Sequence, residues 1–217
     1  MRSGNKTKKA EEIRELIIST AMRRFIHFGI SKTKMDEIAN ELSLSKPALY
    51  YYFPDKQHLA LGVVSRLFSE YYHSVKSGIK PGLSLEESLS RMIDLRIASF
   101  IKYLMLNISA KAPEIIDSAD MRKLLKDFKK EETRLFIELV KKSGDMFQKR
   151  GEAVQEFIEL YLDSLNGLSY AFAGDIGHDV KSNNKIAKKW VFKQKSLSAI
   201  LIKGAIELHN NHSPSKQ

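Results

Sequence analysis

The strongest chemical signal in the sequence is a short aromatic and basic segment at residues 46–53, KPALYYYF. If this segment is a helix, Leu49 and Phe53 share one side, whereas the lysine, Tyr50 and Tyr51 point away from it. Tyrosine hydroxyls bind phosphates and base edges, their rings contact thymine methyl groups, and a lysine ammonium binds phosphate. The pattern favours a surface that binds nucleic acid. The alternative is core packing, but Tyr50 and Tyr51 cannot both face inward with Leu49 and Phe53.

The elements before this segment predict a helix-turn-helix. Residues 9–28 carry apolar side chains at helical spacing, and Gly29 ends the pattern where a left-handed residue is needed. A second short apolar stripe follows, formed by Met35, Ile38, Ala39 and Leu42. Residues 43–45 interrupt it, and Ser45 is a suitable N-cap for a helix with Pro47 in its first turn. Two short helices joined by three residues match a motif whose second helix lies in a DNA major groove.

At these residues the chain resembles the tetracycline-repressor (TetR) family of bacterial regulators. The resemblance covers roughly residues 10–60 and rests on Phe25, Gly29, Thr33, Ile38, Ala39, the run from Leu44 to Phe53, and Lys56. It departs from the family at Ser43, where glycine is usual. This serine must accept an unfavourable backbone conformation, or the turn must differ.

The resemblance implies that the chain contacts a double-stranded DNA operator through the second short helix and the residues around it. The expected DNA-binding residues are Thr33, Lys34, Ser45, Lys46, Pro47, Ala48, Tyr50, Tyr51, Tyr52 and Lys56. It also implies a homodimer, which lets two short recognition helices read the two half-sites of a palindrome.

Charge gives weaker support for this interpretation. The chain has a formal net charge of +10, yet residues 11–60 contain seven basic and seven acidic side chains. The excess lies in residues 1–10, a candidate disordered arm along the DNA, and in the cluster Lys181–Lys203. We interpret that cluster as a solvated loop and helix start, with contact to nucleic acid or another anionic surface as the alternative.

Catalytic and metal-binding patterns are not evident. The sequence has no cysteine and lacks the H-E-x-x-H, Gly-rich phosphate-loop and G-x-S-x-G patterns. His209 and His212 are three residues apart, a spacing that fits a frayed tail better than a metal site. We therefore expect no enzyme activity, no catalytic residue, no metal and no cofactor.

Two late helices, expected at 152–174 and 187–210, are apolar on more than one side. The first carries a strip of small residues that lets another backbone approach closely, and the second has two apolar faces. Together they predict a four-helix bundle with a second copy, the alternative being a monomer in which both helices are central. The expected interface residues are Ser164, Gly167, Ala171, Gly174, Leu197, Leu201, Gly204 and Leu208.

Ionisable residues inside apolar stripes mark a candidate ligand site. Arg96 interrupts the stripe of a helix expected at 84–109, and Glu132 that of a helix expected at 120–143. The two charges could pair with each other or lie at an exposed edge, or Arg96 and Tyr103 could meet an anionic or polar small molecule. The family resemblance implies a pocket among these helices and a ligand-driven shift of the helix expected at 56–76. The candidate ligand-binding residues are Met92, Arg96, Ser99, Tyr103, Phe128, Glu132, Leu135, Tyr161 and Leu165.

Together these observations predict an all-α protein of about nine helices, including a short helix at 113–119. Residues 1–56 would form a three-helix DNA-binding domain, with residues 1–9 as the arm, and residues 57–217 an effector-binding and dimerisation domain. The expected function is a cytoplasmic, homodimeric transcriptional regulator, a repressor released from a palindromic operator by a small molecule. No segment is apolar and long enough to span a membrane. The alternatives are a regulator controlled by a protein partner or by nothing, and a helical scaffold or enzyme whose aromatic helix binds protein.

Overall fold

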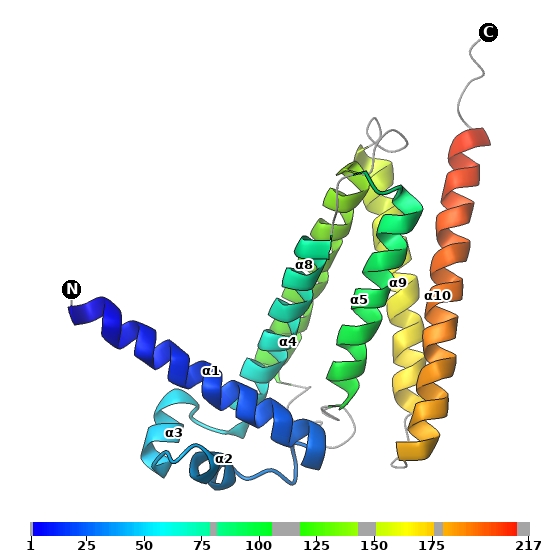
Figure 1. Cartoon of the computed structure of the whole chain (residues 1–217). Coiled ribbons are helices and arrows are strands. Elements are labelled where there is room, and N and C mark those ends of the chain that lie inside the picture. The colour runs from blue at the N-terminus through cyan, green and yellow to red at the C-terminus, as the bar shows by residue number, and fades with distance from the viewer. Residues whose placement is uncertain (1, 79–81, 106–117, 143–150, 176–179, 212–217) are drawn as a thin grey trace. The chain divides into compact units, whose positions relative to one another are not determined.

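The computed structural model describes residues 2–78, 82–105, 118–142, 151–175 and 180–211, with side chains in 7–78, 82–102, 118–142, 154–172 and 187–207. These residues form eight α-helices and no β-strand (Figure 1). The prediction of an all-α fold is confirmed, whereas the short helix expected at 113–119 lies almost wholly outside the described residues. The helices are α1 (Arg2–Phe28), α2 (Met35–Glu41), α3 (Lys46–Tyr52), α4 (Lys56–Gly78), α5 (Leu85–Met105), α8 (Ala119–Lys142), α9 (Gly151–Asp175) and α10 (Val180–Asn211).

Two helices begin earlier than the sequence pattern predicts. α1 starts at Arg2 rather than about Lys9, so residues 2–9 are helical where an arm was expected. α10 starts at Val180 rather than residue 187, which corrects the expectation of a lysine-rich loop. The physical reason is shared: residues 6–10 are mostly lysine and alanine, which favour helices, and residues 180–203 contain neither proline nor glycine until the helix is well established.

Helix ends follow the local chemistry of their capping residues. Gly29 ends α1 with a φ of 82°, the left-handed conformation expected at that position. The predicted capping box at the start of α5 is confirmed, since Ser84 N donates to Glu87 Oε2 at 2.8 Å and Glu87 N donates to Ser84 Oγ at 3.2 Å. The first bond also stabilises the ionised carboxylate, so the pKa of Glu87 is lowered, chiefly through the Ser84 backbone N–H.

The chain divides into two compact units. The first comprises residues 1–70 and 99–128, and the second comprises residues 71–98 and 129–217. The functional boundary expected at residue 56 stays a prediction, and all residues before it belong to the first unit. Helices α4, α5 and α8 each contribute residues to both units.

The first unit is built around the apolar sides of α1 to α4. Ile17, Ala21 and Phe25 of α1 pack with Ile38 of α2 and Leu49 of α3 in one cluster, which Met121 of α8 also joins. A Cβ added to Gly62 of α4 would lie 3.0 Å from a Phe53 ring carbon, so glycine permits this close approach. This core holds α2 and α3 beside α1 (Figure 1).

The second unit contains an antiparallel pair of long helices, α9 and α10 (Figure 1, yellow and orange to red). The rings of Phe172 and Trp190 stack with centroids 5.1 Å apart, and the hydroxyls of Tyr161 and Ser198 are 2.7 Å apart. Gln194 Nε2 donates to the Leu165 carbonyl and to Ser169 Oγ, each at 2.9 Å. These contacts fix which residues of the two helices lie opposite each other.

Candidate nucleic-acid interface

The turn between α2 and α3 is tight. The position of α3 is set by this turn and by the residues at the start of the helix. Ser43 takes a φ of 54°, so serine here adopts the left-handed conformation that glycine accepts without strain. Leu44 N donates to the Ala39 carbonyl at 2.9 Å and closes the turn. Ser45 Oγ accepts from Ala48 N at 3.3 Å, which confirms the predicted N-cap, and Pro47 lies in the first turn of α3.

Helix α3 separates a buried side from an exposed side, as its sequence predicts. Leu49 is fully buried and Phe53, just after the helix, is nearly so. Tyr51 is 82% exposed and Tyr50 is 37% exposed. The half-buried Tyr52 packs against the core, and its ring meets that of Tyr51 edge-on with centroids 5.4 Å apart. The core therefore orients Tyr52, while Tyr50 and Tyr51 remain free to contact another molecule.

The basic and polar groups beside these tyrosines are also exposed. Lys46 Nζ lies 5.9 Å from the centre of the Tyr50 ring and donates to Asp36 Oδ2 at 3.1 Å. The hydrogen bond to Asp36 raises the pKa of the Lys46 ammonium. Lys34, Ser45 and Pro47 are exposed and Ala48 is half-buried. The exposed groups offer donors, a cation and aromatic rings from one short helix and the segment before α2.

Ion pairs hold α2 against α1. Arg24 is bonded to both Glu37 and Glu41 of α2, at 3.0 Å for Glu41, and Arg23 also bonds Glu41. The pKa of Glu37 is lowered, first by the Lys34 backbone N–H and then by Arg24, and that of Glu41 is lowered by Arg23 and Arg24. Sequence reasoning counted these charges without pairing them. The spacing of these charges along α1 and α2 was the only signal in the sequence. Which charges pair between the two helices depends on the geometry of the turn that joins them.

Two of the predicted DNA-binding residues have a different role in the structure. Thr33 is 1% exposed, and its hydroxyl donates to the Gly29 carbonyl at 2.9 Å, so this side chain is not presented to a ligand. Lys56, at the start of α4, donates to the carbonyls of Ser31 and Thr33 at 3.2 and 3.3 Å. The prediction that the Thr33 side chain contacts DNA is therefore corrected. A buried hydroxyl is more stable when bonded to the backbone than when unpaired. Lys56 fastens the loop before α2.

The candidate ligand residues fall into several places. Arg96 Nε donates to Glu132 Oε1 at 2.9 Å, and the Tyr71 hydroxyl donates to the same oxygen at 2.8 Å. Arg96 also bonds Asn166. Among the interpretations that the sequence left open for Arg96 and Glu132, the geometry shows that the two charges pair with each other. Burial opposes the charge on Arg96, but Glu132 raises its pKa, and burial beside Glu132 raises the pKa of Tyr71 well above its ordinary value.

Of the remaining candidates, Tyr161 interacts electrostatically with Arg96 and Glu132, and the others are described by their own contacts. Ser99 and Phe128 belong to the first unit, where Phe128 stacks on Phe68 with centroids 4.0 Å apart. The side chain of Tyr103 lies outside the described residues. The other candidates are buried in the second unit, and burial raises the pKa of Tyr161 to about 12. They are Met92, Leu135, Tyr161 and Leu165.

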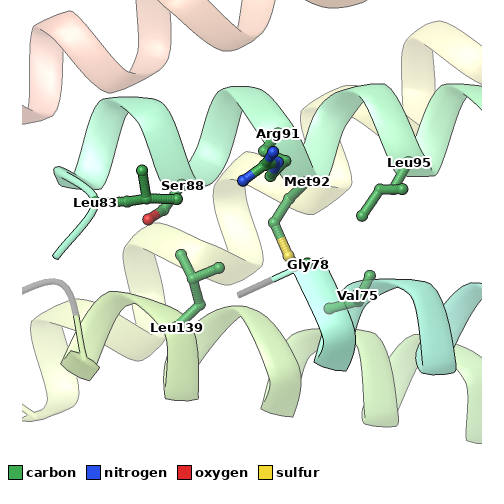
Figure 2. Close-up of a pocket in the computed structure, with 8 residues that line it drawn as sticks. All are labelled: Val75, Gly78, Leu83, Ser88, Arg91, Met92, Leu95 and Leu139. Carbon is green, nitrogen blue, oxygen red and sulfur yellow. The ribbon is translucent and has the colours of Figure 1, made fainter. Parts of the chain in front are cut away.

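A small pocket in the second unit lies between the end of α4, the start of α5 and α8 (Figure 2). Only Met92 among the candidates lines it. The wall is apolar, with the Ser88 hydroxyl and the Arg91 guanidinium as its polar groups. Sequence reasoning missed this site because it searched for charges within apolar stripes, whereas Arg91 is exposed. The lining residues are Val75, Gly78, Leu83, Ser88, Arg91, Met92, Leu95 and Leu139.

The expected interface residues on α9 and α10 are largely accessible. Gly167 and Ala171 are exposed, and Ser164, Leu197, Leu201 and Gly204 are half-buried. A Cβ added to Gly167 or Gly204 would meet nothing within 4 Å. The exposure of Gly174 and Leu208 lies outside what the structure describes. Sequence reasoning missed four large exposed apolar residues on the same helices, Leu160, Tyr170, Phe192 and Ile200.

Among the described residues, no helix is long and apolar enough to cross a membrane. Within the same part of the chain, no three histidine, cysteine, aspartate or glutamate side chains are grouped so as to hold a metal ion.

Comparison with known sequences gives matches concentrated on the helix-turn-helix. AcrR, an HTH-type transcriptional regulator of Shigella flexneri, is 37% identical over 75 residues, which are 34% of this chain and 31% of AcrR. The HTH-type transcriptional regulator RutR of Escherichia coli O157:H7 is 26% identical over 134 residues, 57% of this chain and 61% of RutR. The chain thus spans less than two thirds of each of these relatives.

The fold is shared over more of the chain. The crystal structure of a transcriptional regulator from Cytophaga hutchinsonii has a TM-score of 0.75 at 24% identity, covering 88% of this chain and 96% of that one. A tetR-family regulator from Streptomyces coelicolor has a TM-score of 0.58 at 16% identity, covering 95% and 91%. Residues 17–63 match the family described as bacterial regulatory proteins, tetR family. This match includes all of α2 and α3, so the helix-turn-helix segment of this chain is similar to that of bacterial regulatory proteins of the tetR family.

Proposed function

We propose that this protein is a homodimeric repressor that binds a palindromic DNA operator through α3 and leaves it when a small molecule binds. The proposal that α3 contacts DNA rests on the separation of buried and exposed side chains on this helix. Leu49 is buried in the core, whereas Lys46, Tyr50 and Tyr51 project from it. An exposed, rigidly capped helix bearing a cation and two aromatic donors fits a major groove. The other proposed contacts are Lys34, Ser45, Pro47 and Ala48, with Lys56 acting through the loop.

The homodimer is supported by the length of α3. A seven-residue helix reaches few base pairs, and a two-fold pair doubles the number read. The accessible apolar and small residues of α9 and α10 supply a surface on which a second copy can dock.

Release by a small molecule is supported by the second unit, which contains a small pocket lined by one exposed arginine, Arg91. A ligand acts as an effector only if it binds the released conformation more tightly than the operator-bound one. Native mass spectrometry of the purified chain, followed by mild denaturation, tests for a retained compound. A single unliganded mass, with no thermal shift from a metabolite library, contradicts this part of the proposal alone.

The DNA-binding part is tested by selecting the purified chain against a pool of random-sequence duplexes and footprinting the enriched sites. We expect an inverted repeat, protected as two half-sites and bound by one dimer, and repression of a reporter placed behind it. Absence of any enriched duplex overturns the proposal. Tight capture of a protein by α3, with no DNA selected, favours the scaffold alternative.

A further inference from the structure

The pocket between α4, α5 and α8 is lined by two polar side chains that bond nothing else in the described part of the chain. Ser88 is only 6% exposed, and Arg91, three residues later on α5, is exposed. Within the described residues, no hydrogen bond reaches the Ser88 hydroxyl, and no hydrogen bond or ion pair reaches the Arg91 guanidinium. Buried hydroxyls are normally hydrogen-bonded, so one without a partner in a pocket wall marks a place for a polar group from another molecule.

The spacing of Ser88 and Arg91 lets both act on one group. Residues three apart on a helix lie on the same face, with Cβ atoms roughly 5–6 Å apart. A guanidinium is a permanent cation that only donates hydrogen bonds, and a serine hydroxyl can donate one more. One positive charge and donors from two side chains suit a carboxylate, which has one negative charge and two accepting oxygens.

The acidic neighbours of Arg91 on α5 are already engaged. Glu87 lies one turn before Arg91, but its carboxylate accepts from Ser84 N at 2.8 Å in the capping box. Asp94 lies three residues after Arg91 and pairs with Lys195 at 2.6 Å. The guanidinium is therefore not neutralised from its own helix, and its charge remains available to an anion.

The rest of the pocket wall is apolar and small in extent. Val75, Met92 and Leu139 are at most 2% exposed, and Met92 reaches from α5 towards Gly78 of α4 (Figure 2). The empty volume is about 200 Å³, including the open mouth. This is roughly the volume of seven water molecules, so an occupant has on the order of eight non-hydrogen atoms.

The two helix ends at the pocket set the direction of an anionic occupant. The last turn of α4, with Val75 and Gly78, carries the partial negative charge of a helix C-terminus, whereas the first turns of α5 carry partial positive charge. The charged group is therefore favoured beside α5, near Ser88 and Arg91. The apolar part is favoured against the end of α4.

We propose that this pocket binds a monocarboxylate with a short apolar tail, of roughly six carbon atoms in all. Its carboxylate accepts from the Ser88 hydroxyl and the Arg91 guanidinium, and its tail lies among Val75, Met92 and Leu139. This rests on the proposed release by a small molecule and names the chemical class of that molecule. A phosphate monoester fits less well, because its second negative charge meets no second cation among the residues that line the pocket.

Binding of hexanoate to the full chain tests the proposal, with hexanamide as a neutral probe of the same size. The chain has seven methionines, and Met92→Leu identifies the Met92 methyl signal in a ¹³C-methyl NMR spectrum. We expect hexanoate to shift this signal with a dissociation constant below about 1 mM, and hexanamide to bind at least about tenfold more weakly. Equal binding of the two probes, or no shift at about 10 mM hexanoate, overturns the proposal.

Substitution of the two polar residues tests which groups hold the carboxylate. Arg91→Gln should weaken hexanoate binding about tenfold or more, and Ser88→Ala about three- to tenfold. Neither change should alter hexanamide binding by more than about twofold. Lys126→Gln removes an exposed cation of α8 that does not line the pocket, and it should leave the affinity unchanged. Equal losses for Arg91→Gln and Lys126→Gln reveal general charge attraction and contradict the site.

Substitution of Gly78 tests the position of the tail. A Cβ at this position would lie 3.3 Å from Leu95 Cδ1, and the φ of Gly78 is not positive, so alanine narrows the pocket without backbone strain. Gly78→Ala should weaken hexanoate binding about three- to tenfold but butanoate binding less than about twofold. Equal effects on the two acids place the tail elsewhere and refute the proposed orientation.

Operator release separates this inference from the proposed function. If hexanoate binds as expected but leaves operator affinity unchanged, the carboxylate site stands and release by this class of molecule fails. If another compound releases the operator, and Arg91→Gln and Ser88→Ala leave its affinity unchanged, the proposed function stands and the inference about the pocket is refuted.

Discussion

Arg96 and Glu132 form a buried ion pair, with Nε and Oε1 2.9 Å apart and side chains only 8% and 1% exposed. Glu132 also accepts from Tyr71, and Arg96 reaches Asn166, so residues from α4, α5, α8 and α9 meet at one carboxylate and one guanidinium. A buried pair of this kind is costly to break, because removing one partner leaves the other charge unpaired in the interior.

Replacing one partner of this pair should therefore destabilise the protein strongly. We expect Arg96→Met to lower the free energy of unfolding by about 3–5 kcal/mol, and Arg96→Met with Glu132→Leu to lower it less. Urea unfolding followed by circular dichroism provides the measurement. Lys129→Ala, which breaks the exposed pair with Asp163, should cost about 1 kcal/mol or less. A double variant weaker than both single variants contradicts the explanation.

Alkaline pH should weaken the fold through Tyr161. Its pKa in the folded protein is raised to about 12, so the unfolded chain releases this proton first and stability falls as pH rises. The contribution is fully present below about pH 10 and is lost towards pH 12, a total of about 2–3 kcal/mol. Urea unfolding across this range should show a smaller alkaline loss for Tyr161→Phe. The remaining slope includes Tyr71, whose pKa is also raised.

Because Ser43 has a left-handed backbone conformation, replacing it with glycine should stabilise the folded protein. A non-glycine residue costs about 1–2 kcal/mol in this conformation, and glycine recovers most of it while increasing the entropy of the unfolded chain. Ser43→Gly should therefore raise the free energy of unfolding by up to about 1 kcal/mol, whereas Ser43→Val should lower it. Thermal denaturation of both variants measures the difference, and equal effects of the same sign would refute the argument from φ.

Tyr51 should contribute to DNA binding and little to folding. Tyr51→Ala removes a ring that is 82% exposed, so the unfolding midpoint should hardly change. Affinity for the selected operator should fall about ten- to a hundredfold, measured by fluorescence anisotropy. Tyr51→Phe keeps the ring and isolates the hydroxyl contribution. Full affinity of the alanine variant removes Tyr51 from the interface.

Lys56 is expected to act through the loop before α2 rather than through a phosphate. Lys56→Met retains the aliphatic stem but cannot donate to the Ser31 and Thr33 carbonyls. Operator affinity should fall, while the slope of log affinity against log salt stays unchanged. A slope reduced by about one unit instead identifies Lys56 as a direct phosphate contact.

Sequence reasoning was most accurate where one residue determines one local geometry. Gly29, Ser45 and Ser84 stand at the helix ends where their chemistry predicts them, and the buried positions of α3 follow from its spacing. It was less accurate where the outcome depends on contacts between helices. Nothing local distinguishes a Thr33 hydroxyl that meets DNA from one that bonds the Gly29 carbonyl.

The same limit explains the candidate ligand site. Periodicity placed Arg96 and Glu132 in separate apolar stripes but could not tell whether they face each other. Ser99 and Phe128 share helical stripes with these residues, yet they belong to the other compact unit. Which residues of a long helix join which core depends on the helices packed around it, and this information is not contained in the spacing of one helix.

Pairing of Arg23 and Arg24 with Glu37 and Glu41 occupies two of the cations in the helix-turn-helix. Attraction to random sequence scales with the number of phosphates neutralised, so residence on non-cognate DNA should be brief. A helix-turn-helix of this kind would find its DNA site through many short encounters rather than by long residence on other sequences.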